Sequence, residues 1–264
     1  MDCRLYPESM RPYSHLIPRS MRQYSHLIPR SMKQYSHLIP RMLVLLCGAI
    51  LLQTSLHAQD SQRWRDSLAV LNQLIAGSSW STDLHLRKAT ANLQLQQWEY
   101  AADEYSQVLQ REPHNPAALF YRGYANTHLR RFDMARNDYE ELLKLVPRHF
   151  EARLSLAYVL QQSGRRQEAL DQLNQTVELN PDSAIAYASR AALERELQQT
   201  EAALYDWEQA SRLDPKDAGF VVSHVDLLIA LNRREEARRV LDAAVGRGIP
   251  RGWLREWYDR IRKK

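Results

Sequence analysis

Residues 82–115 read TDLHLRKATANLQLQQWEYAADEYSQVLQREPHN, and residues 116–149 read PAALFYRGYANTHLRRFDMARNDYEELLKLVPRH. The two stretches share a spacing that continues along the chain. Proline recurs every 34 residues, at Pro113, Pro147, Pro181 and Pro215. Alanine recurs with the same period, at Ala101, Ala135, Ala169, Ala203 and Ala237. A fixed period of this length indicates a repeat architecture made from one supersecondary unit.

Numbering each unit so that the proline is position 32 places a small residue and a large residue at fixed points. Position 8 holds Ala89, Gly123, Ala157, Ala191 and Val225. Position 24 holds Tyr105, Tyr139, Leu173, Trp207 and Leu241. The small residue lets two antiparallel helices, A and B, approach closely, and the large one fills the space beside them. The proline ends helix B. One unit cannot bury its apolar face alone, so the units must stack.

This pattern resembles the tetratricopeptide repeat (TPR) family, whose 34-residue unit is a helix–turn–helix. The resemblance implies an all-α, right-handed superhelix (α-solenoid) of about five repeats. The expected units are 82–115, 116–149, 150–183, 184–217 and 218–249. The chain departs from the family pattern at three points. No unit has Trp at position 4, the inter-helix turn has glycine only at Gly164, and the fifth unit lacks proline at position 32.

Comparing the units with each other predicts ion pairs between helices A and B. Positions 7 and 23 hold Lys88 with Glu104, Arg122 with Asp138, and Arg190 with Asp206. In the other two units both charges are missing. We interpret these residues as structural pairs, worth about 0–1 kcal/mol each if they are exposed.

Capping helices are expected at both ends of the solenoid, because its two open faces must be covered. In the segment 59–81 the residues Trp64, Leu68, Leu71 and Ile75 form one apolar helical stripe. In the segment 250–264 the expected stripe consists of Trp253, Leu254, Trp257 and Ile261. Basic residues surround the second stripe, so an alternative role for this last helix is contact with an anionic partner.

The N-terminal region predicts export. Copies of an eleven-residue phrase, each beginning with Met, occupy much of residues 1–31, and the last copy ends at Arg41. We interpret these copies as a duplicated start, with Met1, Met21, Met32 or Met42 as the initiator. Residues 32–58 read as a signal peptide, with a positive start, an apolar run from 42 to 52 that is too short to span a membrane, and cleavage near Ala58. The expected location is the periplasm or cell surface of a Gram-negative bacterium, with membrane contact only through the signal peptide.

Charge along the chain argues against nucleic-acid binding. The 264 residues contain 36 Lys+Arg and 31 Asp+Glu, a net charge of +5. Residues 1–41 hold seven basic and two acidic groups, which account for the whole excess, and residues 59–264 are balanced at 29 against 29. A charge-balanced body has no polyanion-binding signature.

The body of the chain shows no catalytic motif. Both cysteines precede residue 59, and no phosphate-binding loop, zinc-protease or nucleophile-elbow motif occurs. The histidines lack metal-ligand spacing; His114 and His149 fall in inter-repeat turns and are expected to be solvated. We therefore expect no enzyme activity, cofactor or metal.

The resemblance implies a concave groove lined by the A helices, chiefly at positions 2, 5, 9, 12 and 13. On this chain the candidate peptide-binding residues are Leu86, Phe120, Tyr124, His128, Leu154, Tyr158 and Arg195. Aromatic anchors with a polar rim are typical of interface hot spots. The expected function is a non-catalytic scaffold that binds a protein or peptide. We expect a monomer, with an oligomer as the alternative. The alternatives are that positions 5 and 9 only pack within the repeats, or that the tyrosines stack on a carbohydrate or envelope polymer.

Overall fold

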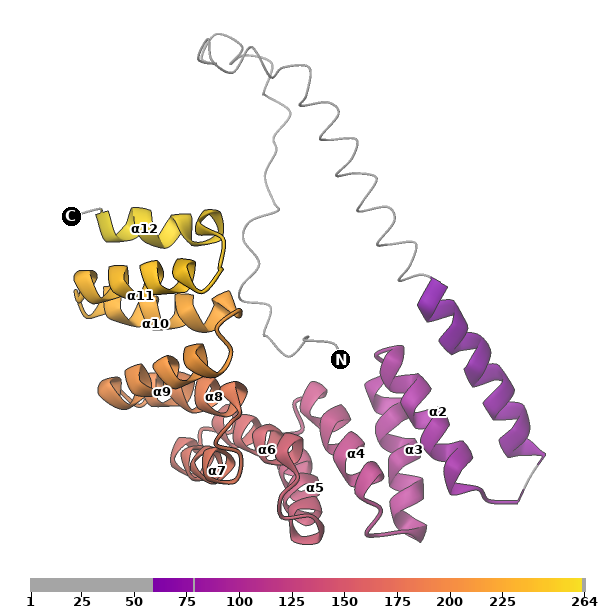
Figure 1. Cartoon of the computed structure of the whole chain (residues 1–264). Helices are drawn as coiled ribbons and strands as arrows, with labels where there is room; N and C mark the ends of the chain where they lie inside the picture. The colour runs from indigo at the N-terminus through magenta and orange to yellow at the C-terminus, as the bar shows by residue number, and fades with distance from the viewer. Residues whose placement is uncertain (1–58, 78, 263–264) are drawn as a thin grey trace, which may run out of the picture. The chain divides into compact units, whose positions relative to one another are not determined.

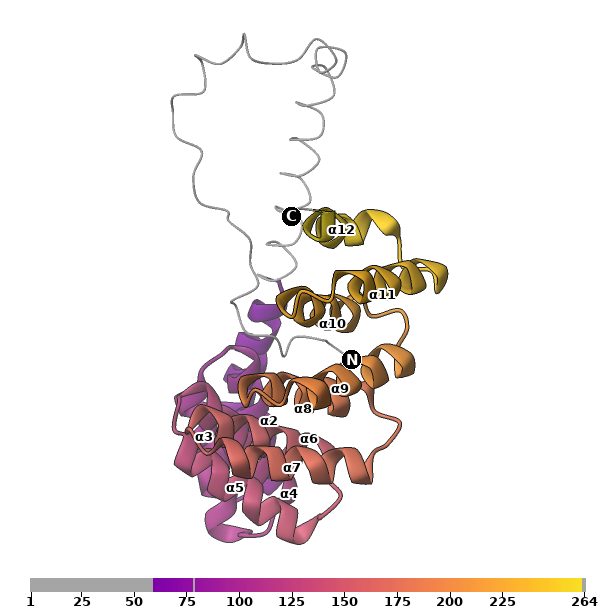
Figure 2. The ribbon, with the colours of Figure 1, turned by 90° about the vertical axis from the view of Figure 1, so that its left-hand side faces the viewer.

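The computed structural model describes residues 59–77 and 79–262. The predicted leader and signal peptide, residues 1–58, lie outside the described residues. The described residues contain helices and turns, and the all-α solenoid expected from the sequence is confirmed. Figures 1 and 2 show the helices following one another as a stack of hairpins in chain order.

Five helical hairpins form the body of the structure. They pair α2 (Thr82–Gln94) with α3 (Trp98–Arg111), α4 (Pro116–His128) with α5 (Phe132–Leu145), α6 (Phe150–Gln162) with α7 (Arg166–Leu179), α8 (Ala184–Glu196) with α9 (Thr200–Leu213), and α10 (Ala218–Ala230) with α11 (Arg234–Gly246). Every A helix therefore begins at position 1 of a 34-residue unit. Each B helix packs against the A helix that follows it, so one unit covers the apolar face of the next.

The residue before each A helix is its N-cap. Ser81, Asn115, His149, Ser183 and Asp217 each accept a hydrogen bond from a backbone N–H in the first turn. These side chains satisfy donors that have no partner inside the helix. The expectation that His149 is a solvated turn residue was therefore wrong, because its Nδ1 accepts from the backbone N–H of Ala152 at 3.3 Å.

The turn between helices A and B uses a left-handed residue in all five units. Gly164 has φ of 78°, and the same position holds Gln96, Arg130, Gln198 and Asn232 with φ between 58° and 60°. Side chains with a Cβ adopt this conformation at a cost of about 1 kcal/mol. The missing glycines thus leave the turn geometry unchanged and introduce local strain.

Small and large residues face each other between the two helices of a unit, as the sequence predicts. A Cβ added to Gly123 would lie 2.9 Å from Cε1 of Tyr139, whose side chain is fully buried. The fifth unit has the larger Val225 at this position, and there the opposite residue is the smaller Leu241; both are fully buried. In these two units the two positions therefore compensate for each other in volume.

The three predicted ion pairs are confirmed. Lys88 contacts Glu104, Arg122 contacts Asp138 and Arg190 contacts Asp206, each with a closest N···O distance of 2.6 Å. The side chains of Asp138 and Asp206 are only 4% and 1% exposed, so the energy expected for exposed pairs does not apply to them. Breaking a buried pair leaves an uncompensated charge, which costs about 3–5 kcal/mol.

Helices flank the hairpins at both ends. In the helix over residues 59–76 the predicted stripe is the covered side, with Leu71 buried and Trp64, Leu68 and Ile75 half-buried. At the other end, the 3-10 turn Arg251–Leu254 precedes α12 (Arg255–Arg262), which contacts α10 and α11.

One member of the predicted C-terminal stripe was assigned wrongly. Trp253 is 67% exposed, whereas Leu254 is fully buried and Trp257 and Ile261 pack against the core. The 3-10 turn changes the helical register just before α12, and Tyr258 occupies the buried place instead.

Candidate binding groove

An apolar row follows the A helices of the first three repeats. Leu86, Phe120 and Leu154 occupy position 5 of α2, α4 and α6, and all three are half-buried against the core of these repeats. Part of each side chain therefore stabilises the stack, and part remains available to a ligand. Both the structural and the binding interpretation of position 5 apply to the same residues.

Tyr124 and His128 lie together at the C-terminal half of α4. Their ring centroids are 4.6 Å apart, and His128 stacks on Trp98 at 4.0 Å with nearly parallel planes. Trp98 also meets Tyr124 edge-on at 6.0 Å. Although His128 remains exposed at its edge, the loss of water from the stacked face lowers its pKa, and burial raises the pKa of Tyr124. Both rings are thus neutral near pH 7 and present an apolar, hydrogen-bonding surface.

Phe120 belongs to an adjoining aromatic group at the N-terminal half of α4. Its ring stacks on His149 at 5.3 Å and meets Tyr121 edge-on at 5.2 Å. His149 therefore holds two roles, as the N-cap of α6 and as a partner of Phe120. The Phe120 side chain is fixed between two repeats, which restricts its rotamers before any ligand arrives.

Tyr158 and Arg195 lie farther along the A helices. Tyr158 of α6 is 45% exposed, and Arg195 of α8 is exposed as well. Among the described residues, no ring contact or hydrogen bond joins either side chain to the aromatic groups of α4. The structure therefore brings Tyr124, His128 and Phe120 into two neighbouring groups on one helix and leaves Tyr158 and Arg195 as separate contact points.

Trp98, Tyr121 and His149 are members of this surface that the sequence interpretation missed. Trp98 opens helix B of the first unit, and the stack on His128 joins residues 30 apart in the chain. A signal was available, since an aromatic residue opens helix B in the first two units, Trp98 and Phe132, and in no other unit.

The described part of the chain lacks a cluster of metal-ligating side chains. Its His, Cys, Asp and Glu side chains form no group of three or more that is placed to hold a metal ion. Within residues 59–77 and 79–262, no helix combines the length and apolar character that a membrane span requires.

Helical hairpins that repeat every 34 residues and stack in chain order define an α-solenoid, a class of proteins with an extended concave surface. Two tetratricopeptide repeat models match the chain, over residues 86–139 and 128–193. The chain is a tetratricopeptide repeat protein, and the expected family is confirmed.

Solved structures of similar fold agree with this assignment. MamA from Desulfovibrio magneticus RS-1 is 21% identical with a TM-score of 0.57, covering 62% of this chain and 93% of that one. A tetratricopeptide repeat protein from Parabacteroides merdae is 20% identical with a TM-score of 0.54, covering 78% and 80%. YrrB, described as a TPR protein with an unusual peptide-binding site, is 18% identical with a TM-score of 0.54, covering 67% and 92%. These likenesses establish the fold. Among curated proteins, no relative matches the chain.

Proposed function

We propose that the protein is a non-catalytic scaffold that binds a protein or peptide in its A-helix groove. The observation that carries this proposal is the preorganised aromatic surface of α4, where Trp98, Tyr124 and His128 stack on one another with an exposed edge. Fixed aromatic side chains lose little conformational entropy on binding and are enriched at interface hot spots.

The proposed binding mode places apolar side chains of an extended or helical segment against this surface. Phe120 extends it on α4, Leu154 and Tyr158 continue it on the neighbouring α6, and Arg195 meets a carboxylate of the ligand. The unusual peptide-binding site described for YrrB supports this proposal by analogy of fold.

Crosslinking with mass spectrometry on the full chain in its host tests the groove. The informative variant is His128→Ala with Tyr158→Ala, because both side chains are exposed and their removal leaves the core intact. The matched control is Tyr100→Ala on α3, a tyrosine that is 66% exposed on a B helix. We expect partners to be lost in the double variant and retained in the control. An identical partner set in all three proteins would overturn the groove proposal.

Carbohydrate binding is the alternative function, and the same variants test it in a second assay. If the purified full chain binds an envelope polysaccharide in affinity electrophoresis, and the groove variant alone loses this binding while protein partners remain unchanged, the ligand is a polymer. Sedimentation velocity of the same sample tests the proposed monomer.

We also propose that the chain is exported to the bacterial envelope. The support is the positive start and the apolar run within residues 32–58, followed by a short polar segment that ends at Ala58. N-terminal sequencing of the protein recovered from its host tests this proposal. A start near Gln59 is expected, and an N-terminus upstream of Met42 would refute it.

A further inference from the structure

An arginine at position 7 bridges two B helices in the second and fourth repeats. Arg122 donates to Asp138 in its own unit and to Ser106 Oγ of the preceding unit, the latter at 3.3 Å. Arg190 likewise donates to Asp206 and to Asn174 Oδ1, the latter at 3.1 Å. In both repeats the partners lie sixteen residues before and sixteen residues after the arginine. The guanidinium therefore fills the space between consecutive B helices.

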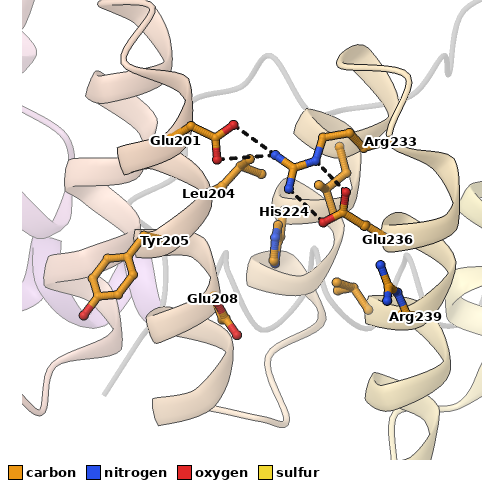
Figure 3. A pocket seen from close by; sticks show the side chains of 10 residues that line it. Glu201, Leu204, Tyr205, Glu208, His224, Arg233, Glu236 and Arg239 are labelled. Carbon is orange, nitrogen blue, oxygen red and sulfur yellow. Dashed lines mark hydrogen bonds and ion pairs between the residues drawn. The ribbon is translucent and has the colours of Figure 1, made fainter.

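The fifth repeat lacks this guanidinium. Position 7 is His224, the residue sixteen after it is Val240, and the residue sixteen before it is Glu208. Between α9, α10 and α11 the structure has an open hollow of about 330 Å³, which Figure 3 shows with His224, Glu208 and Arg239 around it. The shorter side chains thus leave unfilled the space that an arginine occupies elsewhere.

Two polar side chains at this hollow form no hydrogen bond to another described residue, although they interact electrostatically with each other. His224 is only 8% exposed, and the described residues provide no hydrogen bond to its ring. Glu208 is exposed and forms no ion pair within the described part of the chain. Both side chains therefore present hydrogen-bonding atoms that a ligand in the hollow can contact.

The cations near the hollow do not take this role. Arg233 is occupied, since it donates to both carboxylate oxygens of Glu236 at 2.7 Å and to Glu201 at 3.0 Å (Figure 3). Arg239 lies on the rim, is exposed, and interacts electrostatically with Glu236. With His224 neutral, the lining holds three carboxylates and two guanidinium groups, so it carries one net negative charge.

We propose that the hollow between α9 and α11 binds an arginine side chain of a partner protein, which takes the place of the arginine that the fifth repeat lacks. Leu204, Leu228 and Val240 provide apolar walls for the methylene groups. Glu208 accepts from the guanidinium, a charge-assisted bond that suits its planar geometry. Burial lowers the pKa of His224, so its ring is neutral near pH 7 and offers an acceptor nitrogen.

A pair of short peptides tests this site. The probes are acetyl-Gly-Arg-Gly-amide and the same peptide with citrulline, which has the shape of arginine without its charge. Binding is followed by NMR through the His224 ring signals of the full chain at pH 7.5. We expect saturable shifts with the arginine peptide and at least tenfold weaker binding of the citrulline peptide.

The variant His224→Arg with Val240→Asp restores the residues of the second and fourth repeats and fills the hollow. Because it has no His224 signal, its binding is measured by calorimetry alongside the wild type, and it should lose the arginine peptide. The single variant Glu208→Gln, which changes an exposed residue and leaves the fold intact, should bind at least fivefold more weakly. Absence of saturable His224 shifts, equal binding of the two peptides, or unchanged binding by Glu208→Gln would overturn the proposal. The hollow shares no residue with the A-helix groove, so its failure leaves the proposed function standing.

Discussion

Replacing Glu194 by glutamine should remove a pH-dependent loss of stability from the fourth repeat. Glu194 lies on α8 and is 6% exposed, and its Oε2 is buried without a hydrogen bond. Across from it on α9 lies the buried carboxylate of Asp206, which Arg190 binds through two nitrogens at 2.6 and 2.9 Å. The same guanidinium lies 3.8 Å from Glu194, so one cation serves two buried carboxylates.

The magnitude follows from the pKa of Glu194. Desolvation by burial, together with the neighbouring Asp206, raises the pKa from 4.5 to about 7. The unfolded chain therefore releases this proton at lower pH than the folded chain does. The contribution of Glu194 to stability is therefore greatest below about pH 4.5, falls as the pH rises toward 7, and stays low above that value. A shift of this size corresponds to at most about 3 kcal/mol.

The second repeat shows why glutamine should relieve this loss. Asn126 occupies there the position of Glu194, and its Nδ2 donates to Asp138 at 3.4 Å. An amide provides a donor toward the neighbouring carboxylate at every pH, whereas Glu194 provides one only when protonated.

Thermal unfolding of the wild type and Glu194→Gln at pH 5 and pH 8 provides the assay. The two proteins should unfold at similar temperatures at pH 5, and at pH 8 the variant should unfold about 6–12 °C higher, at roughly 2–4 °C per kcal/mol for a chain of this size. Glu178→Gln, on the exposed face of α7, is the control and should leave the profile unchanged. If wild type and variant differ equally at both pH values, the assigned titration is wrong.

Two predictions concern the buried ion pairs and the left-handed turns. Asp138→Asn should lower the free energy of unfolding by about 3 kcal/mol in urea titrations, because it leaves Arg122 unpaired. The control is the exposed pair of Glu99 with Arg131. There, Glu99→Gln should lower the free energy of unfolding by less than about 1 kcal/mol. Equal losses would refute the role of burial. Gln198→Gly should raise the free energy of unfolding by about 0.5–1 kcal/mol, because φ of 60° strains glutamine; an unchanged or lowered value would contradict the strain.

The period of 34 residues was sufficient to predict most of the fold, because each element repeats the same local chemistry. The alternation of small and large residues at positions 8 and 24 located the contact of helices A and B, and charge pairing at positions 7 and 23 was visible by comparing units. Burial was not visible in the same way. Whether Asp138 is exposed depends on the preceding and following helices, which a pattern within one unit does not describe.

The candidate groove was predictable only in part. Positions on the A helices identified Phe120, Tyr124 and His128. Trp98 and His149 come from outside those positions: Trp98 touches the groove from helix B of the preceding repeat, and His149 touches it from the N-cap of α6. Trp253, which is exposed, was wrongly assigned to the buried stripe. The apolar spacing of the sequence does not reveal that residues 251–254 form a 3-10 turn, which changes the helical register.

The third repeat explains why the loss of an ion pair alone does not create a binding site. It also lacks the pair, with Leu156 at position 7 and Gln172 at position 23. Here the buried Leu156 fills the space. Arg153 extends from position 4 and donates to Gln172 at 2.9 Å and to Gln175 at 2.6 Å, so the polar groups are hydrogen-bonded. In the fifth repeat position 4 is Val221, whose side chain offers no donor, and the His224 ring forms no hydrogen bond among the described residues. The two losses differ in their compensation: of these two repeats, the fifth has the open hollow, which His224 and Glu208 line without forming a hydrogen bond among the described residues.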